Sequence, residues 1–499
     1  MINKRFSLYR VEVQSTYAKM KILEVLMRKA LLFLLSISMV PSLAFAGGEL
    51  SFDGQHLSPL WSIPFIGIIL SIAVFPLIAP RIWDNHYGKI VAGWTLLFFI
   101  PLFITYDLSI TTNIFAHALI EEYIPFILLL LVLFAASGGI HISGNLVASP
   151  KFNVSILAIG TVLASVMGTT GAAMLLIRPI LSANKNRKHR MHIPIFFIFL
   201  VANIGGGLTP LGDPPLFLGF LNGVDFFWTL EHMFLPVLLF SLILLSLFYV
   251  IDSYYFNKEN IAKSDEKTTV VIVGKQNFLI ILGVLLGIIV SGVWIPGINW
   301  TVFGVEVHLE NILRDLFFIF LTIVSLKITS KKIRLDNNFN WHPIIEVAKI
   351  FAGIFLTIVP VITILEAGKA GAFSGIVEIT HTDSGEPINV IYFWVTTVLS
   401  AFLDNAPTYL VFFKMAGAQA PDGLAAADYL MNGIPATLLA ISMGTVFTGP
   451  LTYIGNAPNF MVKSMAEQEG IKMPSFFGYM FIAMIVLIPV YILLNFIFL

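Results

Sequence analysis

The sequence contains no cysteine and few charged residues. Only 12% of its 499 residues are charged, whereas 57% are hydrophobic and the mean hydropathy is +0.89. A soluble globular chain carries about 25% charged residues, so this composition is typical of a membrane protein. The absence of cysteine excludes disulfides, thiolate metal sites and cysteine nucleophiles. The 29 basic residues balance the 29 acidic ones, which gives no reason to expect nucleic acid as a partner.

The first 46 residues have the features of a targeting segment. A basic stretch begins at Met27, an apolar stretch covers residues 30–40, and Ala44-Phe45-Ala46 has the small residues of a cleavage site. This order predicts a secretory signal peptide cleaved after Ala46, with an uncleaved N-terminal helix as the alternative. Both place Gly47 outside the cytoplasm, as expected for a multi-pass protein of a bacterial-type inner (plasma) membrane.

Charged loops predict which side of the membrane each segment faces. Loops 182–191 and 327–342 are rich in Lys and Arg, and such loops are normally cytoplasmic. The loops expected around residues 107–123 and 366–387 lack this excess, so they are predicted to be periplasmic.

Long charge-free runs fill the rest of the chain, and a helix needs about 20 apolar residues to cross a bilayer. The order of crossings places every basic loop in the cytoplasm only if residues 152–181 and 388–414 do not cross the membrane. We therefore expect each of these two segments to enter the membrane and return to the same side, as a re-entrant hairpin. We therefore predict an all-α polytopic membrane protein with about ten transmembrane helices and two re-entrant hairpins.

The two halves of the chain resemble each other. Residues 397–401 match residues 161–165 at an offset of 236, and residues 451–460 match residues 208–217 at an offset of 243. Five of the ten positions in the second pair are identical, Gly and Pro included. Each half has an odd number of crossings, so the second half is inverted. The predicted units are a signal peptide or N-terminal helix (1–46), a first inverted repeat (57–251), a cytoplasmic linker (252–275) and a second inverted repeat (276–499).

Glycine and proline interrupt a helix at matching places in the two halves. Residues 205–210 and 449–458 cannot form intact lipid-facing helices, because backbone groups freed from the helix must be satisfied or must line a cavity. Inverted repeats with broken helices are the signature of secondary transporters, which bind substrate near the membrane midplane. The hairpin tips, 168–171 and 404–407, are expected to face these breaks.

Two motifs carry a family resemblance. Gly-Gly-Leu-Thr-Pro-Leu-Gly-Asp-Pro-Pro at 206–215 and Leu-Asp-Asn-Ala-Pro at 403–407 resemble the ion transporter superfamily. That group includes NhaD-type sodium/proton antiporters, the citrate transporters (CitMHS-like) and dicarboxylate transporters. The resemblance covers about residues 57–499 and implies a homodimer whose site lies between two hairpin tips and two broken-helix loops. Dicarboxylate members have Ser-Asn-Thr at both tips, which this chain lacks.

Asp213 and Asp404 are the only carboxylates within these four elements. A buried carboxylate in a membrane is a functional hypothesis by default, so both are candidate sodium ligands or proton carriers, with capping of backbone N–H groups as the alternative role. Amides and hydroxyls of the same elements are the other candidates for ion or substrate binding, with bracing of the backbone as their alternative: Asn405, Asn456, Thr169, Thr170, Thr209 and Thr452.

These features predict a secondary active transporter that works by alternating access, without enzyme activity and without a bound cofactor. Two neighbouring carboxylates repel each other, so the pair favours binding of a positive ion. A proton and a sodium ion then compete for the same site. Sodium/proton antiport is therefore the leading prediction. The alternative is symport of citrate or a similar organic anion with a cation, in which half-helix N-termini hold the carboxylates. Small ions, an organic anion and the lipid bilayer are the expected partners.

Overall fold

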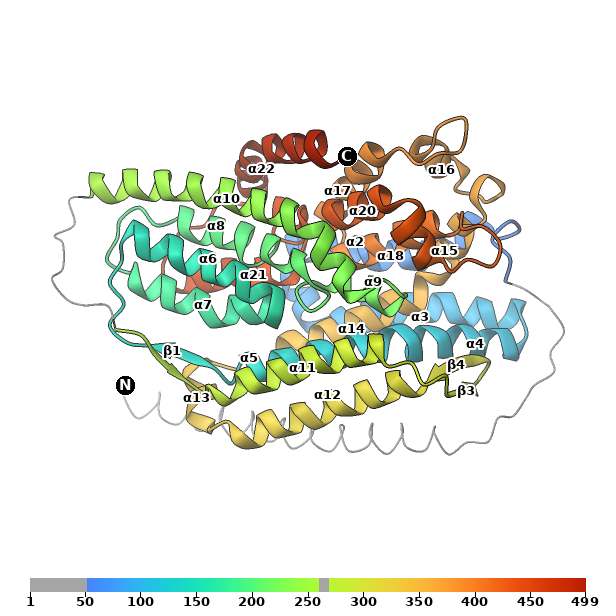
Figure 1. The fold of residues 1–499 in the computed structure, drawn as a ribbon, viewed down its shortest axis with the longest axis horizontal. Coiled ribbons are helices and arrows are strands. Elements are labelled where there is room, and N and C mark those ends of the chain that lie inside the picture. The colour runs from blue at the N-terminus through green and yellow to red at the C-terminus, as the bar shows by residue number, and fades with distance from the viewer. Residues whose placement is uncertain (1–51, 260–268) are drawn as a thin grey trace.

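The computed structural model describes residues 52–259 and 269–499. The predicted signal peptide, and part of the predicted linker, lie outside the described residues. Within them the chain is almost entirely helical (Figure 1). Eight of the described helices are long and apolar enough to span a membrane, and a bent pair makes up to nine. These features confirm the prediction of an all-α polytopic membrane protein.

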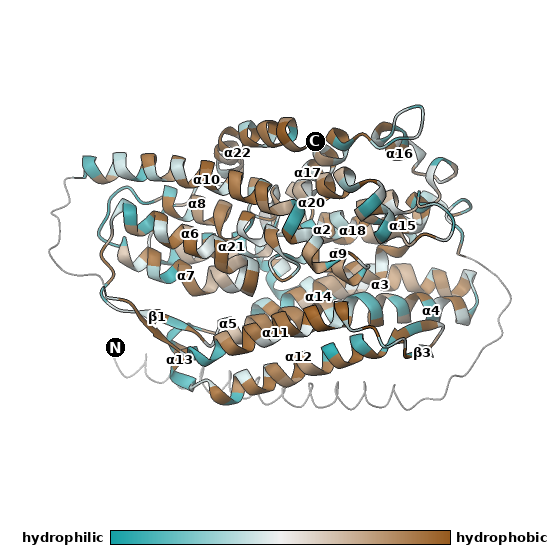
Figure 2. Cartoon of the chain, in the orientation of Figure 1, coloured by the Kyte–Doolittle hydropathy of each residue, from teal (hydrophilic) through white to brown (hydrophobic). Residues whose placement is uncertain are grey.

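The long helices present apolar side chains to their surroundings. Figure 2 shows α10, α11, α12 and α22 as predominantly hydrophobic, with hydrophilic residues gathered toward helix ends and loops. Ile104 and Phe496 are 77% and 88% exposed. Because such exposure would be costly in water, these surfaces are lipid-facing.

The first half contains three helical segments, a hairpin, a broken helix and a long helix. The hairpin is α6–α7, and the break lies between α8 and α9. The elements are η1 (Pro59–Ser62), α2 (Ile63–Ile78), α3 (Pro80–Thr105), α4 (Leu108–His117), η2 (Ala118–Tyr123), α5 (Ile124–Ser137), β1 (His141–Ser143), α6 (Pro150–Met167), α7 (Thr169–Ala183), α8 (His192–Leu200), η3 (Ile204–Leu208), α9 (Pro214–Leu221) and α10 (Phe226–Lys258).

The second half repeats this order. Its hairpin is α17–α18, and its break lies between α20 and α21. The elements are β2 (Val271–Val273), α11 (Gln276–Val293), β3 (Asn299–Val302), β4 (Val305–His308), α12 (Leu309–Ile328), α13 (Lys331–Asp336), α14 (His342–Thr357), α15 (Val359–Glu366), η4 (Gly368–Ala370), α16 (Ser374–Thr380), α17 (Asn389–Phe402), α18 (Asn405–Gly417), α19 (Ala426–Asp428), η5 (Tyr429–Gly433), α20 (Pro435–Val446), η6 (Gly449–Leu451), α21 (Ala457–Gln468) and α22 (Phe476–Phe498).

Two short antiparallel strand pairs mark opposite ends of the bundle (Figure 1). In β1–β2, His141 is opposite Val273, and in β3–β4, Asn299 is opposite His308. The β1–β2 pair joins the segment that follows α5 to the linker (252–275) that is predicted to be cytoplasmic. The pair β3–β4 links the far ends of α11 and α12.

One predicted loop is helical instead. The segment holding Glu121 and Glu122 continues the helix from α4 to α5 through the π-helical turn η2. His117 Nε2 lies 2.9 Å from Glu121 Oε2, and Lys414 interacts electrostatically with the buried Glu122. The loop prediction was wrong because these partners, one of them distant in the sequence, compensate charges that would otherwise disfavour a helix in a membrane.

The helices form two groups. On one side α3, α5, α11, α12 and α14 pack together, and on the other side the hairpins and broken helices pack with α10 (Figure 1). Helix α5 contacts both α7 and α9 and therefore joins the groups. The candidate site lies where the groups meet.

Candidate functional site

The first hairpin turns within a single residue. Gly168 separates α6 from α7 with a φ of +78°, a left-handed conformation that glycine adopts without steric cost. The next residue, Thr169, donates its backbone N–H to the carbonyl oxygen of Gly212 at 3.0 Å. The tip of this hairpin is therefore attached to the break between α8 and α9.

The second hairpin places a carboxylate at its tip. Asp404 is the N-cap of α18, and one of its oxygens accepts the backbone N–H of Ala406 at 3.3 Å. The capping alternative for this residue thus has a geometric basis. The neighbouring Asn405 is completely buried, and its Oδ1 has no hydrogen-bond partner among the described residues.

The two breaks have the same internal geometry. A Cβ on Gly212 would lie 2.2 Å from the carbonyl oxygen of Gly206, and a Cβ on Gly455 would lie 2.6 Å from that of Gly449. Both pairs are related by the offset of 243 seen in the sequence. Only glycine allows the backbone to fold back on itself this closely, which explains why these positions match between the halves.

Thr209 and Thr452 brace the breaks. The hydroxyl of Thr209 donates to the carbonyl oxygen of Ser165 at 2.5 Å, and that of Thr452 donates to the carbonyl oxygen of Ala401 at 2.5 Å. Donors and acceptors are both repeat equivalents, at offsets of 243 and 236. Each bond ties a break to the hairpin of its own half, and neither threonine lines the cavity described below. The geometry favours the bracing role for both.

Asp213 occupies the centre of the arrangement. It is 1% exposed and accepts hydrogen bonds from Asn405 Nδ2 at 2.6 Å, Asn456 Nδ2 at 3.3 Å and Thr169 Oγ1 at 3.4 Å. Thr169 and Asn405 occupy equivalent positions in the two hairpins, and Asn456 occupies the position in the second half that is equivalent to Asp213. Asp213 is therefore bound by three neutral donors from three different elements.

These elements enclose a cavity of about 100 Å³. Five candidate residues line it: Thr169, Thr170, Asp213, Asp404 and Asn456. The wall formed by α5 and α14 is apolar, with Leu129, Leu133, Val347 and Phe351 among its residues. The four elements predicted from the sequence thus meet at one place, with their polar side chains on one side of the cavity.

Two further asparagines belong to the site and were not predicted. Asn203 Oδ1 accepts from Asn456 Nδ2 at 3.2 Å, and Asn203 Nδ2 donates to Asn459 Oδ1 at 2.7 Å. Asn459 in turn donates to the carbonyl oxygens of Gly449 at 2.9 Å and Thr452 at 3.0 Å. Buried amides must be paired, so these residues fix one break against the other. Asn459 lies inside the repeated motif, a signal that the sequence offered; Asn203 lies outside it.

The comparison with known families agrees with this geometry. The family CitMHS_2, described as "Putative citrate transport", matches residues 54–499. No curated protein matches the chain. The match confirms the resemblance to citrate transporters and does not extend to the NhaD-type antiporters. It also favours the citrate alternative over sodium/proton antiport, which led the sequence predictions.

Proposed function

The chain belongs to the CitMHS_2 family, and from this membership we propose that it carries citrate or a similar small carboxylate together with a cation. It is a multi-pass membrane transporter of that family. The identity of the anion, the coupling to a cation and the roles of individual residues are the substance of the proposal.

One observation carries it: four helices begin at the central cavity. These are α7, α9, α18 and α21, whose first residues are Thr169, Pro214, Asn405 and Ala457. Thr169, Pro214 and Ala457 line the cavity, as does Asp404, the N-cap of α18. The N-terminal end of a helix carries a positive partial charge, which favours anions. At its first two positions α9 offers only this charge, because Pro214 and Pro215 have no N–H. Four such helix ends around one cavity suit a substrate with several carboxylates.

The carboxylates of Asp213 and Asp404 give the same cavity a place for a cation. Both carboxylates would repel a bare anion. An anion that binds together with a cation would not be repelled, because the cation compensates the negative charge. In this proposal Asp213 holds the coupling cation, and the unpartnered Oδ1 of Asn405 is a second oxygen ligand. Oxygen atoms of carboxylates and amides suit hard cations such as sodium, and a proton on Asp213 would serve the same coupling.

The arrangement also suits alternating access. Both hairpins and both breaks are joined to one another through Asp213, Thr169 and four asparagines: Asn203, Asn405, Asn456 and Asn459. The opposite wall, on α5 and α14, contributes only apolar side chains to the cavity. An apolar surface without fixed hydrogen bonds allows the hydrogen-bonded unit to slide against it.

The homodimer, the location in an inner membrane and the predicted sides of the loops stay predictions.

The test is uptake of radiolabelled citrate into proteoliposomes that contain the purified protein. An inward gradient of sodium or of protons is imposed, and empty liposomes serve as the background. Accumulation of citrate above equilibrium that depends on one of these gradients supports the proposal. Absence of citrate uptake under every gradient, with the protein folded and oriented in the membrane, would refute it.

A further inference from the structure

The two hairpins carry a matched pair of cations away from the central cavity. Arg178 lies on α7 and Lys414 on α18, and the two are related by the hairpin offset of 236. Each lies nine positions beyond the first residue of its helix, Thr169 or Asn405. At 1.5 Å per residue each cation is therefore about 14 Å along the helix from the hairpin tip. The central site uses neither of them.

Arg178 is bound to the other group of helices. With its amide oxygen facing the guanidinium group, Asn338 accepts from Nη1 of Arg178 at 2.6 Å and from Nη2 at 3.1 Å. Asn338 lies between α13 and α14, and α13 contacts β1 at one end of the bundle (Figure 1). The preceding residue, Asn337, donates to the carbonyl oxygens of Gly138 at 3.0 Å and Ile140 at 2.7 Å, directly after α5. Arg178 thus attaches the first hairpin to the end of α5.

Lys414 lies near the opposite end of α5. Glu122 belongs to η2, which runs directly into the start of α5, and it is 7% exposed. Lys414 interacts with Glu122 electrostatically. The charged atoms of the two are nevertheless more than 4.0 Å apart, and neither side chain makes a hydrogen bond among the described residues. A buried carboxylate without a partner is unfavourable, so Glu122 has an unused capacity to bind a cation.

Two other charged residues interact electrostatically with Lys414, and neither competes with Glu122 as a buried partner. His117 repels a cation when it is protonated, and its Nε2 already lies 2.9 Å from Glu121. Glu366, at the end of α15, is exposed. Glu122 is therefore the buried carboxylate that is left for Lys414.

The two contacts exclude each other if the hairpins move as one unit. Both partners are fixed to the ends of a single helix, α5, whose 14 residues span about 21 Å. Both cations belong to the hydrogen-bonded unit of hairpins and breaks. A shift of this unit that closes the gap between Lys414 and Glu122 also moves Arg178, and a hydrogen bond is lost when it is stretched by about 1 Å. One contact is made in this structure, and the other is open.

We propose that Arg178 and Lys414 are alternating latches that determine which conformation of the transport cycle is stable. In one conformation, the one seen here, Arg178 binds Asn338 and Lys414 is released. In the other, Lys414 binds Glu122 and Arg178 is released. This inference rests on the alternating access in the proposed function, but it requires no particular substrate.

The test measures from which side of the membrane the central cavity is reached, without any substrate present. Because the chain has no cysteine, Thr170→Cys introduces a single thiol into the cavity lining. The full-length protein is labelled with an impermeant maleimide in spheroplasts and, separately, in inverted membrane vesicles. The ratio of the two labelling rates reports the balance between the conformations. Met461→Cys, also in the lining, is a second reporter.

Variants of the two latches should shift this ratio in opposite directions. Arg178→Gln removes the guanidinium group, and a lost hydrogen bond to a charged group should shift the ratio by about tenfold. Asn338→Gly should shift it in the same direction; it tests the same latch if Arg178→Gln does not fold, because glycine readily adopts the φ of +46° found at Asn338.

Lys414→Gln and Glu122→Gln should both shift the ratio the other way. The exposed cations Lys185 and Lys369 offer the matched controls Lys185→Gln and Lys369→Gln, which should leave the ratio unchanged.

The outcomes separate this proposal from the proposed function. Shifts in one direction for both latches, or a shift for only one of them, would overturn the alternation. Unchanged ratios in a protein that accumulates citrate would overturn the latches and keep the proposed function. Opposite shifts in a protein that takes up no citrate would keep the latches and refute the substrate. A thiol that reacts from one side only in every variant would refute alternating access itself.

Discussion

The paired threonines of the breaks allow a quantitative test of bracing against ligand binding. Replacing threonine by valine keeps the shape and removes the hydroxyl. Thr209→Val loses the bond to Ser165 and the acceptor for the N–H of Leu211. Thr452→Val loses the bond to Ala401 and the acceptor for the N–H groups of Ile454 and Gly455. Each hydrogen bond contributes about 1 kcal/mol net, so we expect losses of roughly 2 kcal/mol for Thr209→Val and roughly 3 kcal/mol for Thr452→Val.

Thermal unfolding of the purified proteins in detergent, followed by tryptophan fluorescence, measures the relative stabilities of the two variants and the wild type. Thr452→Val should melt at the lowest temperature, Thr209→Val next, and the wild type highest. Thr170→Val is the control, because Thr170 lines the cavity and its hydroxyl makes no bond to either break. The two bracing variants should keep the wild-type KM for substrate. Native melting combined with a raised KM in either would mean that its hydroxyl is a ligand, and would refute the bracing role.

Three further predictions address the scaffold. Asp252 is completely buried and binds Arg187, His192 and Asn153, so Asp252→Asn should destabilise the protein by about 3–5 kcal/mol; an unchanged melting temperature would contradict this. Gly212→Ala should prevent folding because its Cβ would overlap the carbonyl of Gly206, whereas Gly93→Ala, which meets open space, should express normally; equal expression would refute the close approach. Because the chain has no cysteine, Asp383→Cys should react with an impermeant maleimide from the periplasmic side and Lys188→Cys should not; the reverse pattern would overturn the inverted threading.

Much of the central site was predictable because its signals are local. Glycine and proline break helices wherever they occur in a membrane, and their repetition at an offset of 243 located both breaks. The hairpin tips followed from the charge pattern. The structure adds which candidates share a cavity: Thr170 and Asp404 line it, whereas Thr209 does not.

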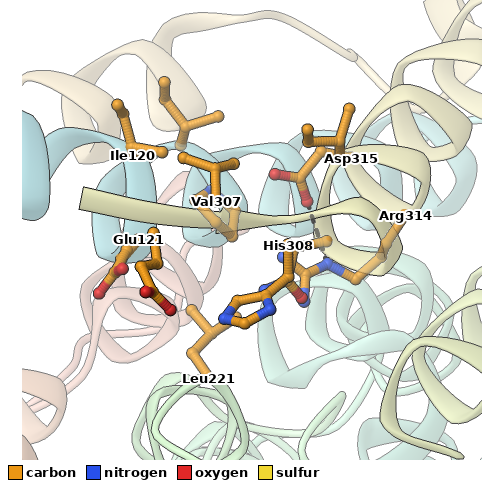
Figure 3. Close-up of a pocket in the computed structure, with 12 residues that line it drawn as sticks. Ile120, Glu121, Leu221, Val307, His308, Arg314 and Asp315 are labelled. Atoms are coloured by element: carbon orange, nitrogen blue, oxygen red, sulfur yellow. Dashed lines mark hydrogen bonds and ion pairs between the residues drawn. The ribbon is translucent and has the colours of Figure 1, made fainter. Parts of the chain in front are cut away.

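Other features depended on contacts between distant segments, which no local pattern reveals. The helix through Glu121 and Glu122 brings the buried Glu122 within electrostatic reach of Lys414, nearly 300 positions away. Nothing in the sequence around Asn203 distinguishes it from other amides near helix ends. Its role follows only from its contact with Asn459. The cavity beside Arg314 (Figure 3) is lined by residues of five elements: η2, α5, α9, β4 and α12. Composition and periodicity predict where helices lie, but not which buried polar groups they bring together.

The central claim is that Asp213 couples a cation to citrate movement, and one measurement tests it most directly. Uptake of labelled citrate by proteoliposomes is compared between Asp213→Asn and Asp84→Asn, a matched change at an exposed aspartate. We predict that Asp84→Asn accumulates citrate as the wild type does. Asp213→Asn should lose all accumulation driven by a cation gradient while the protein stays folded. Gradient-driven accumulation by Asp213→Asn at the wild-type level would contradict the account.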